Sequence, residues 1–337
     1  MNDWRRVGAA LIDGALEASV VGSFTTVGPT LRRRLDHWQD PPAVAGRRIV
    51  ITGASSGLGL AAALALADLG AELVLIGRNA EKLAQAHAEV QARATLPVVA
   101  LRCDLADLAA VRHLSDEIAA EGPVDVLVHN AGALVHEYQR TAAGHELTFT
   151  VHVLAPLLLT ELLVPSLAAA APSRVLFMTS GGLYTQRFAL DQVELGPEGF
   201  DGSVAYARAK RAQVVLTTAL NDQLGPLGIS VHLCHPGWAN TPGVDDALPR
   251  FAKVLGPTLR TPAEGADTLV WLAGQPGGEP TPAGQLWLDR RPRGVHHLAF
   301  TRKSAAEERT DAEQLLRRCQ EAIGLTAPPT TATPPSA

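Results

Sequence analysis

The sequence predicts an α/β fold: a doubly wound, mostly parallel sheet of seven strands with helices on both faces. Three observations predict it. Apolar runs of strand length alternate with helical stretches from residue 47 onward, which is typical of βαβ units. The strand-like runs are apolar throughout, as expected of a parallel sheet that is covered on both sides. Right-handed crossovers between parallel strands then give the doubly wound arrangement.

Seven segments have the length and the apolar content of buried strands. They are Arg48–Thr52, Glu72–Gly77, Val98–Cys103, Val124–Asn130, Arg174–Ser180, Ile229–His235 and Gln285–Asp289. Helical stretches lie between and after them, at residues 57–69, 79–93, 107–121, 142–170, 204–224, 262–273 and about 305–323.

The chain is expected to divide into three parts. Residues 1–46 form a helical extension ahead of the first strand, because their apolar residues roughly follow helical spacing. Residues 47–323 form the α/β domain, in which a Pro- and Gly-interrupted segment at about 241–261 is expected to cover a substrate site. Residues 324–337 are rich in Pro and Thr, and we expect them to be disordered.

The composition indicates a globular protein. Hydrophobic residues make up 47% of the 337 residues, and the net charge of -5 at pH 7 gives no reason to expect nucleic acid as a partner. Basic clusters at Arg32–Arg34 and Arg290–Arg293 are interpreted as solvated surface. The three cysteines are too few and too widely spaced for a zinc site or a disulfide framework. We therefore expect no metal, buried free thiols and a reducing, cytoplasmic compartment.

The sequence contains no uninterrupted apolar span of membrane length. Residues 1–46 could dock on the α/β domain or lie on a membrane surface. Docking is favoured because the polar face of the predicted helix is not strongly cationic. A peripheral membrane contact through this extension stays open as an alternative.

A glycine-rich turn, TGASSGLG at residues 52–59, follows the first predicted strand directly. A strand that turns at once into a helix needs a loop without Cβ atoms, and free N–H groups at the helix start can then hold a phosphate. A plain strand-to-helix turn would use the same glycines, but the position within the first βαβ unit favours a nucleotide site. The cofactor-binding residues expected here are Gly53, Ser55, Ser56, Gly57, Leu58 and Gly59.

The end of the second predicted strand indicates which dinucleotide binds. A carboxylate there would bind the ribose 2′-OH of NAD, whereas a nearby Arg accommodates the 2′-phosphate of NADP. This chain has Gly77 at the strand end followed by Arg78, and no carboxylate. NADP(H) is therefore favoured over NAD(H); the alternative is that Arg78 is only a surface residue.

Together with five further motifs, this turn resembles the short-chain dehydrogenase/reductase family over about residues 47–290. The motifs are Asp104 after the third strand, Asn130-Ala131-Gly132 after the fourth, Ser180 at the end of the fifth, YARAK at 206–210 and HPGWANT at 235–241. Longer stretches at 179–186, 206–217, 235–244 and 265–273 are similar to one group within the family, which also carries an N-terminal extension.

The resemblance implies a Rossmann-type fold and places several residues around a nicotinamide cofactor. Asp104 and Leu105 would line the adenine pocket. Asn130, Ala131 and Gly132 would stabilise the central sheet beside the cofactor. The nicotinamide end would be held by Pro236, Gly237, Ala239 and Thr241.

Three residues are expected to carry the chemistry. Hydride transfer to a carbonyl leaves negative charge on oxygen, so a proton must be supplied, and Tyr206 is the candidate general acid. Lys210 lies four residues further along the same helix, hence on the same face, where a cation would lower the pKa of Tyr206. The resemblance implies that Lys210 also binds the nicotinamide ribose. Ser180 would hydrogen-bond the substrate oxygen. Without the upstream motifs, Tyr206 and Lys210 would be an ordinary surface pair.

One position departs from the family pattern. An Asn that anchors a water in a proton relay is usual on the helix after the fourth strand, and His152 takes its place here. A histidine can donate and accept hydrogen bonds, so a relay could survive, and it can titrate near neutral pH. The alternative is a His that only packs against the sheet.

The sequence therefore predicts an NADP(H)-dependent oxidoreductase. Its small-molecule carbonyl or alcohol substrate is expected to be lipophilic, because the predicted pocket includes Leu183, Tyr184, Trp238 and the Val244–Leu255 segment. The alternative is a non-catalytic NADP(H)-binding sensor or scaffold, which the departure at His152 motivates. Oligomers through the helices at 142–170 and 204–224 are common in this fold, but the sequence does not decide between oligomer and monomer.

Overall fold

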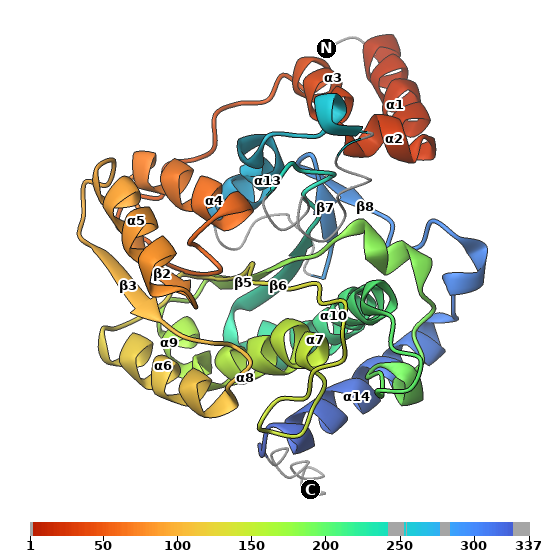
Figure 1. Ribbon diagram of the computed structural model, residues 1–337. Coiled ribbons are helices and arrows are strands. Elements are labelled where there is room, and N and C mark those ends of the chain that lie inside the picture. The colour runs from red at the N-terminus through yellow and green to blue at the C-terminus, as the bar shows by residue number, and fades with distance from the viewer. Residues whose placement is uncertain (1–2, 242–252, 254, 277–283, 326–337) are drawn as a thin grey trace, which may run out of the picture.

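A computed structural model of the protein describes residues 3–241, 253, 255–276 and 284–325. Its centre is one sheet in the order β3-β2-β1-β4-β5-β6-β7-β8 (Figure 1). The strands are β1 (Arg48–Thr52), β2 (Glu72–Gly77), β3 (Val98–Arg102), β4 (Val126–His129), β5 (Ser173–Met178), β6 (Ile229–Cys234), β7 (Leu286–Leu288) and β8 (Arg291–Arg293). The strands from β1 to β7 pair in parallel, so the predicted α/β class is confirmed.

The predicted count of seven strands is one too low. β8 pairs antiparallel with β7, and Pro292 stands opposite Trp287. Its sequence, Arg-Pro-Arg, has no apolar alternation, and Pro is tolerated because the strand lies at the sheet edge. A strand of this composition gives no pattern that a sequence analysis could detect.

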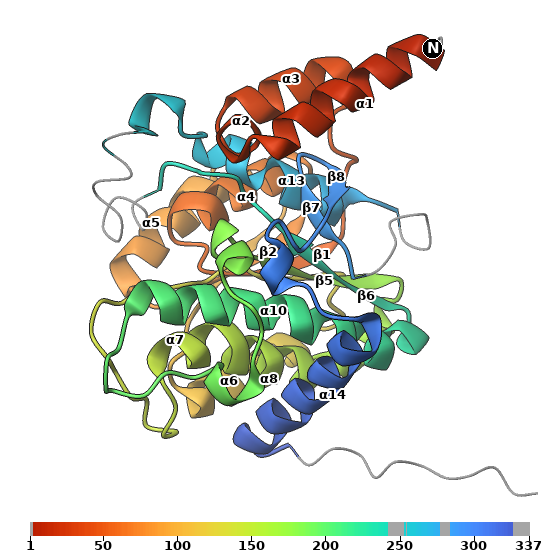
Figure 2. The same ribbon diagram turned by 90° about the vertical axis from the view of Figure 1, so that its right-hand side faces the viewer.

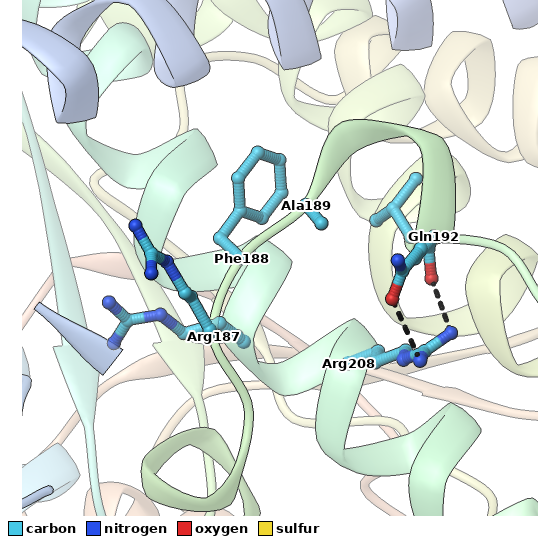
Figure 3. Close-up of a pocket in the computed structure, with 7 residues that line it drawn as sticks. Arg187, Phe188, Ala189, Gln192 and Arg208 are labelled. Atoms are coloured by element: carbon cyan, nitrogen blue, oxygen red, sulfur yellow. Dashed lines mark hydrogen bonds between the residues drawn. The ribbon is translucent and has the colours of Figure 1, made fainter. Parts of the chain in front are cut away.

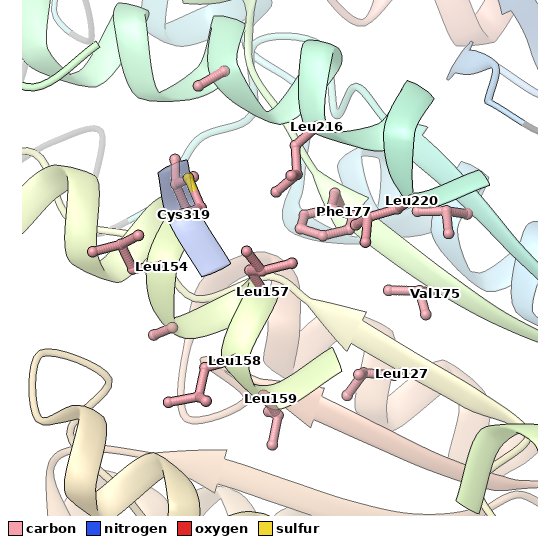
Figure 4. Packing of buried hydrophobic residues seen from close by; sticks show 14 of the residues in the cluster. Leu127, Leu154, Leu157, Leu158, Leu159, Val175, Phe177, Leu216, Leu220 and Cys319 are labelled. Atoms are coloured by element: carbon pink, nitrogen blue, oxygen red, sulfur yellow. The ribbon is translucent and has the colours of Figure 1, made fainter. Parts of the chain in front are cut away.

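Two helical layers cover the sheet. One contains α4 (Gly57–Asp68), α5 (Ala80–Gln91) and α13 (Pro262–Gly274), which pack on one apolar cluster. The other contains α6 (Leu108–Ala120), α8 (Ala155–Leu162), α9 (Val164–Ala169) and α10 (Gly202–Leu224), with α14 (Ala305–Ala322) outside α10 (Figure 2). Figure 4 shows Leu216 of α10 close to Phe177 of β5, with Leu157 of α8 and Cys319 of α14 in the same apolar cluster.

The helix predicted at 142–170 is divided into shorter pieces. α7 (Leu147–Phe149) leads into a π-helical turn, η1 (Thr150–Leu154), and then into α8 and α9. Prolines lie in the first turns of both α8 and α9. Since proline fits the first turn of a helix but not its interior, one continuous helix could not form here. The π-helical turn carries His152, and such turns are frequent at functional sites.

The N-terminal helices α1 (Asp3–Ala18), α2 (Val20–Phe24) and α3 (Val27–Leu35) lie over the end of the molecule near β7, β8 and α13 (Figures 1 and 2). Arg32 is fully buried, with its guanidinium 2.7 Å from Asp13 and 2.6 Å from Asp289. The side chains of Arg290 and Arg293 are also mostly buried. Arg290 pairs with the carboxylate of Asp267, and Arg293 pairs with that of Asp13.

The interpretation of the two basic clusters as solvated surface is therefore wrong for these three arginines. Ion pairing with buried carboxylates explains why they leave water, because a charge is buried only when it is paired. Arg33, in contrast, keeps 60% of its side chain exposed, as predicted. The expected docking of the extension is what the described contacts show. The predicted disordered tail falls almost entirely outside the described residues, as does most of the segment at 241–261.

Candidate active site

The predicted site residues gather at the carboxyl ends of the parallel strands. β1 ends before Gly53, β4 before Asn130, β5 before Ser180 and β6 before His235. In open α/β sheets, ligands bind in the crevice at this edge, where the strand order reverses. Here it reverses between β1 and β4.

The glycine-rich turn is packed so closely that side chains cannot fit. Gly53 has φ of 68°, and a Cβ atom there would lie 2.7 Å from the Cα of Ala131. A Cβ atom on Gly59 would lie 2.3 Å from the carbonyl oxygen of Gly53. The side-chain amide of Asn130 donates to the carbonyls of Thr52 and Gly53, both at 3.1 Å. Asn130 thus holds the turn against the end of β4, and α4 starts within the turn, without a side-chain cap, as a phosphate-binding helix start requires.

The end of β2 opens onto a cleft of about 310 Å³. Its lining includes Arg78, Asp104, Ala106, Asp107, Arg140, Thr141 and Leu147. Arg78 is exposed, and a Cβ atom on the preceding Gly77 would lie 3.3 Å from Ser55 of the glycine-rich turn. Asp104 accepts the backbone N–H of Ala106 at 3.0 Å, and Leu105 is buried. These contacts hold the segment after β3 in place at this end of the crevice.

Arg140 is a second arginine in this cleft that sequence reasoning missed. It lies in the segment between β4 and α7, and its Nε donates to the carbonyl of Gly144 at 2.7 Å. No motif contains this position, so only the folded path of the segment brings Arg140 into the lining of the same cleft as Arg78.

Ser180, Tyr206 and Lys210 meet at the opposite end of the crevice. Tyr206 lies in the first turns of α10, which Asp201 caps by accepting two backbone N–H groups. Ser180 precedes the short helix η2 (Gly181–Thr185), accepts the N–H of Gly182, and lies near enough to the Tyr206 phenol to affect its pKa. The ammonium nitrogen of Lys210 lies 5.5 Å from the centre of the Tyr206 ring and donates to the carbonyl of Met178 at 2.8 Å.

Burial shifts the pKa values of Tyr206 and Lys210. It raises the pKa of the Tyr206 phenol, and the influence of Ser180, which lowers that pKa, is smaller than the effect of burial. It lowers the pKa of Lys210 to about 7. The net shift of the Tyr206 pKa is upward, because the burial of the phenol is its largest cause.

His152 lies beside Tyr206 with the two rings perpendicular and 5.2 Å apart. Its Nε2 is 3.1 Å from the backbone nitrogen of Ala133 and 2.9 Å from that residue's carbonyl oxygen. Burial lowers the pKa of His152 to about 3, so the expected titration near neutral pH is wrong. A Cβ atom on Gly132 would lie 2.7 Å from the ring, so His152 packs directly on the motif that follows β4.

The loop after β6 holds Pro236, Gly237 and Ala239 close to the glycine-rich turn. Gly265 of α13 fits between the loop and the turn, because a Cβ atom there would lie 2.6 Å from Leu58 and 3.0 Å from Ala239. Gly237 has φ of 69°, which favours glycine. Thr241 is the last described residue before the gap. Residues 235–241 are called the nicotinamide-end loop below.

Two residues predicted to line the substrate pocket point elsewhere. Leu183 is fully buried, and Tyr184 packs against His297, with ring centres 4.1 Å apart, and against Phe24. Trp238 is half-buried. The position of Phe24, which comes from the N-terminal helices, could not be read from any motif.

A small pocket near η2 is separate from this crevice. It has a volume of only about 10 Å³, which is room for a single water molecule. Figure 3 shows that Arg208, which lines it, is bound to Gln192. This pocket cannot hold an organic substrate.

Among the described helices, none is long and apolar enough to cross a membrane.

Comparisons with known proteins agree with this geometry. Residues 47–249 match the family model for short chain dehydrogenases. The chain is 35% identical over 269 residues to dehydrogenase/reductase SDR family member 12 of Bos taurus, a match that covers 79% of this chain and 84% of that protein. It is 37% identical over 266 residues to a Streptomyces sp. (strain C5) protein proposed to be the daunorubicin C-13 ketoreductase DnrU, covering 78% of this chain and 88% of that one.

A solved structure is similar as well. The chain aligns with TM-score 0.61 and 27% identity to a protein of Beutenbergia cavernae, proposed to be an NAD(P)-dependent gluconate 5-dehydrogenase. The alignment covers 73% of this chain and 96% of the other, which was crystallised with NADP bound at low occupancy.

Proposed function

Because the chain belongs to the short-chain dehydrogenase/reductase family, we propose that it is an NADP(H)-dependent oxidoreductase that reduces a carbonyl group of a lipophilic small molecule, or oxidises the corresponding alcohol. One observation carries the proposal. Tyr206, with the ammonium nitrogen of Lys210 5.5 Å from its ring centre and Ser180 near enough to affect its pKa, lies at the same sheet edge as a glycine-rich turn too tight for side chains. An enzyme for this reaction needs a proton donor for the substrate oxygen and a turn that binds the phosphates of the cofactor.

The chain's own residues move the proton. The phenol of Tyr206, protonated because its pKa is raised, donates its proton to the substrate oxygen. Ser180 donates a hydrogen bond to the same oxygen and stabilises the charge that develops there. Lys210 donates to the carbonyl of Met178 with its ammonium nitrogen 5.5 Å from the centre of the Tyr206 ring, and it supplies positive charge as the phenolate forms. When bound, the reduced nicotinamide supplies the hydride.

The residues of the crevice fit a dinucleotide with a 2′-phosphate. The glycine-rich turn presents backbone donors where the diphosphate would lie, and Asn130 holds it in shape. Arg78 and Arg140 both line the cleft at the adenine end, and the position after β2 carries no carboxylate. Guanidinium groups bind phosphate in a bidentate manner, which supports NADP(H) over NAD(H).

Apolar residues near Tyr206 support a lipophilic substrate. Gly202, one turn before Tyr206, packs so closely on Val135 that a Cβ atom would lie 1.7 Å from its carbonyl oxygen. This contact brings the segment after Gly132 over the start of α10. Its half-buried Tyr138 packs edge-on against Phe200, with ring centres 5.7 Å apart. Binding sites for organic ligands are mostly lined by such residues.

A non-catalytic NADP(H)-binding sensor is the second candidate, favoured by His152 in place of the usual Asn. The experiment that separates the two is loss of NADPH absorbance over a panel of aldehydes, ketones and quinones, with NADPH binding measured in parallel. Turnover of any member supports the oxidoreductase. Binding without turnover over the whole panel would support the sensor and contradict the proposed reaction.

Exposed apolar side chains support a peripheral membrane contact through residues 1–46. Leu11 of α1 is 71% exposed and Val21 of α2 is 54% exposed, whereas Asp13 of α1 and Arg32 of α3 are buried. Because the extension is docked by buried ion pairs, deleting it would disturb the α/β domain. The suitable variant is therefore Leu11→Glu with Val21→Glu. Unchanged sedimentation with anionic liposomes would contradict this contact.

A further inference from the structure

We propose that the N-terminal helices hold the nicotinamide-end loop in its working position, and that Arg260 is the positioning residue through which they act. The inference rests on the function proposed above, in which residues 235–241 hold the nicotinamide end of the cofactor. It adds a role for a segment that precedes the family's common region.

Arg260 lies in direct contact with the nicotinamide-end loop. A Cβ atom on Gly237 would lie 2.2 Å from the Nε of Arg260, so the loop backbone rests on the guanidinium group. The backbones are also joined: Arg260 donates its N–H to the carbonyl of Trp238, and Asn240 donates to the carbonyl of Arg260, both at 2.8 Å. A displacement of Arg260 would therefore displace the loop.

The end of α2 holds Arg260. Its Nε donates to the carbonyl of Phe24 at 3.0 Å, and its Nη2 donates to the carbonyl of Ser23 at 2.6 Å. The last carbonyls of a helix have no partner within the helix, and a guanidinium group can satisfy two of them at once. The Phe24 carbonyl also accepts the N–H of Trp238 at 2.7 Å, which ties the loop to α2 directly.

A buried ion-pair network fixes this contact. Asp289 accepts from Arg260 through both carboxylate oxygens, at 2.7 and 3.0 Å, and from Arg32 of α3 at 2.6 Å. Arg32 in turn donates to Asp13 of α1 at 2.7 Å. Arg260, Asp289 and Arg32 are all at most 1% exposed. Buried charges tolerate little displacement from their partners, so α1 and α3 specify where Arg260 lies.

The ring of Phe24 completes the contact on the loop's first residues. It lies 4.4 Å from the ring of His235 and 5.6 Å from that of Trp238. His235 accepts the N–H of Gly237 through Nδ1 at 2.9 Å, which shapes the turn that follows. Aromatic packing of this kind holds the start of the loop from the side of the N-terminal helices.

The test compares binding of NADPH with binding of adenosine 2′,5′-bisphosphate, which reaches only the adenine end of the crevice. The variants are Arg260→Lys, which keeps the charge but loses the fork of donors, and Phe24→Ala, which keeps all the ion pairs. The matched control is Asp36→Asn, which weakens the pair with Arg291 elsewhere on the extension. Dissociation constants are measured on the full chain by calorimetry.

We expect Arg260→Lys and Phe24→Ala to weaken NADPH binding at least tenfold, with the bisphosphate constant changed less than twofold. Asp36→Asn is expected to change neither. Equally weakened binding of NADPH and of the bisphosphate, or unchanged NADPH binding in the folded variants, would overturn the inference. If Arg260→Lys does not fold, Phe24→Ala decides, and failure of both to fold would assign these residues to general stability instead. If the unaltered protein binds neither ligand, the cofactor proposal fails first and this inference with it.

Discussion

The ammonium nitrogen of Lys210 lies 5.5 Å from the centre of the Tyr206 ring but gives its hydrogen bond to the carbonyl of Met178. The two residues are one helical turn apart on α10, so their relative position is set by the helix itself. Burial lowers the pKa of Lys210 to about 7 and raises that of Tyr206. Near neutral pH the phenol is therefore protonated, which is the state that carbonyl reduction requires.

The raised pKa of Tyr206 predicts opposite pH dependences for the two directions. Reduction needs the protonated phenol, so its kcat/KM should hold through neutral pH and fall only as the pH rises through that pKa. Alcohol oxidation needs the phenolate, so its kcat/KM should rise with pH over the same range. Initial rates in both directions between about pH 6 and 10 check this. An oxidation rate that peaks on the acidic side would contradict it.

His152 is predicted to act by packing and hydrogen bonding, without titrating. Because burial lowers its pKa to about 3, His152→Asn should leave the shape of the pH profile unchanged between about pH 5 and 8. The rate should change less than about tenfold, since a neutral amide can also bond the backbone of Ala133. If an acidic limb of the wild-type profile disappeared in this variant, His152 would be a titrating group after all.

Arg78 is predicted to set the preference for NADPH. Hydrogen bonds to charged groups contribute about 1.5–3 kcal/mol each, so Arg78→Ala should lower kcat/KM for NADPH about 10- to 100-fold and leave NADH nearly unchanged. Arg140→Ala reports whether the second arginine of the cleft shares this role. Arg93→Ala, on the half-exposed pair with Asp68, is the control. An equal loss with both cofactors would show that Arg78 does not read the 2′-phosphate.

Arg32 is predicted to be a large contributor to stability. Arg32→Met leaves the carboxylates of Asp13 and Asp289 buried with fewer partners, which should lower the free energy of unfolding by about 3 kcal/mol. The control is Arg33→Met, whose side chain is 60% exposed and which should change it by less than about 0.5 kcal/mol. Denaturant unfolding followed by circular dichroism compares the two.

The same network predicts an acid sensitivity. Burial alone would raise the pKa of Asp13, but hydrogen bonds from Arg293 and Arg32 outweigh it and lower that pKa. A carboxyl group with a lowered pKa contributes its stability above its unfolded pKa of about 4 and loses it as the pH falls toward the folded value. The wild type should therefore lose more stability than Arg32→Met between about pH 4 and 2. Parallel losses in both proteins would contradict this.

Most of the sequence motifs located the site because they follow the ends of strands, whereas YARAK lies on α10. Seven strands, the family and the grouping of Ser180, Tyr206 and Lys210 could be predicted, since continuous apolar runs and short motifs encode them locally. The burial of Arg32 could not, because it depends on Asp289, 257 positions away in the chain. The edge strand β8 was missed because Arg-Pro-Arg has no strand pattern.

The proton chemistry was only partly predictable for a similar reason. The spacing of Tyr206 and Lys210 follows from the helix, but the desolvation that dominates both pKa values comes from packing by several elements. Arg260 and Phe24 belong to no motif, and only the folded chain brings them to the nicotinamide-end loop.

The most direct test of the central claim is the turnover of NADPH with a reducible carbonyl substrate by the wild type and by Tyr206→Phe. The substitution removes only the phenolic oxygen, so NADPH binding should be retained, while kcat should fall by a factor of about 100 to 10,000, the usual contribution of a positioned general acid. Full activity in Tyr206→Phe with unchanged NADPH binding would show that Tyr206 is not the proton donor.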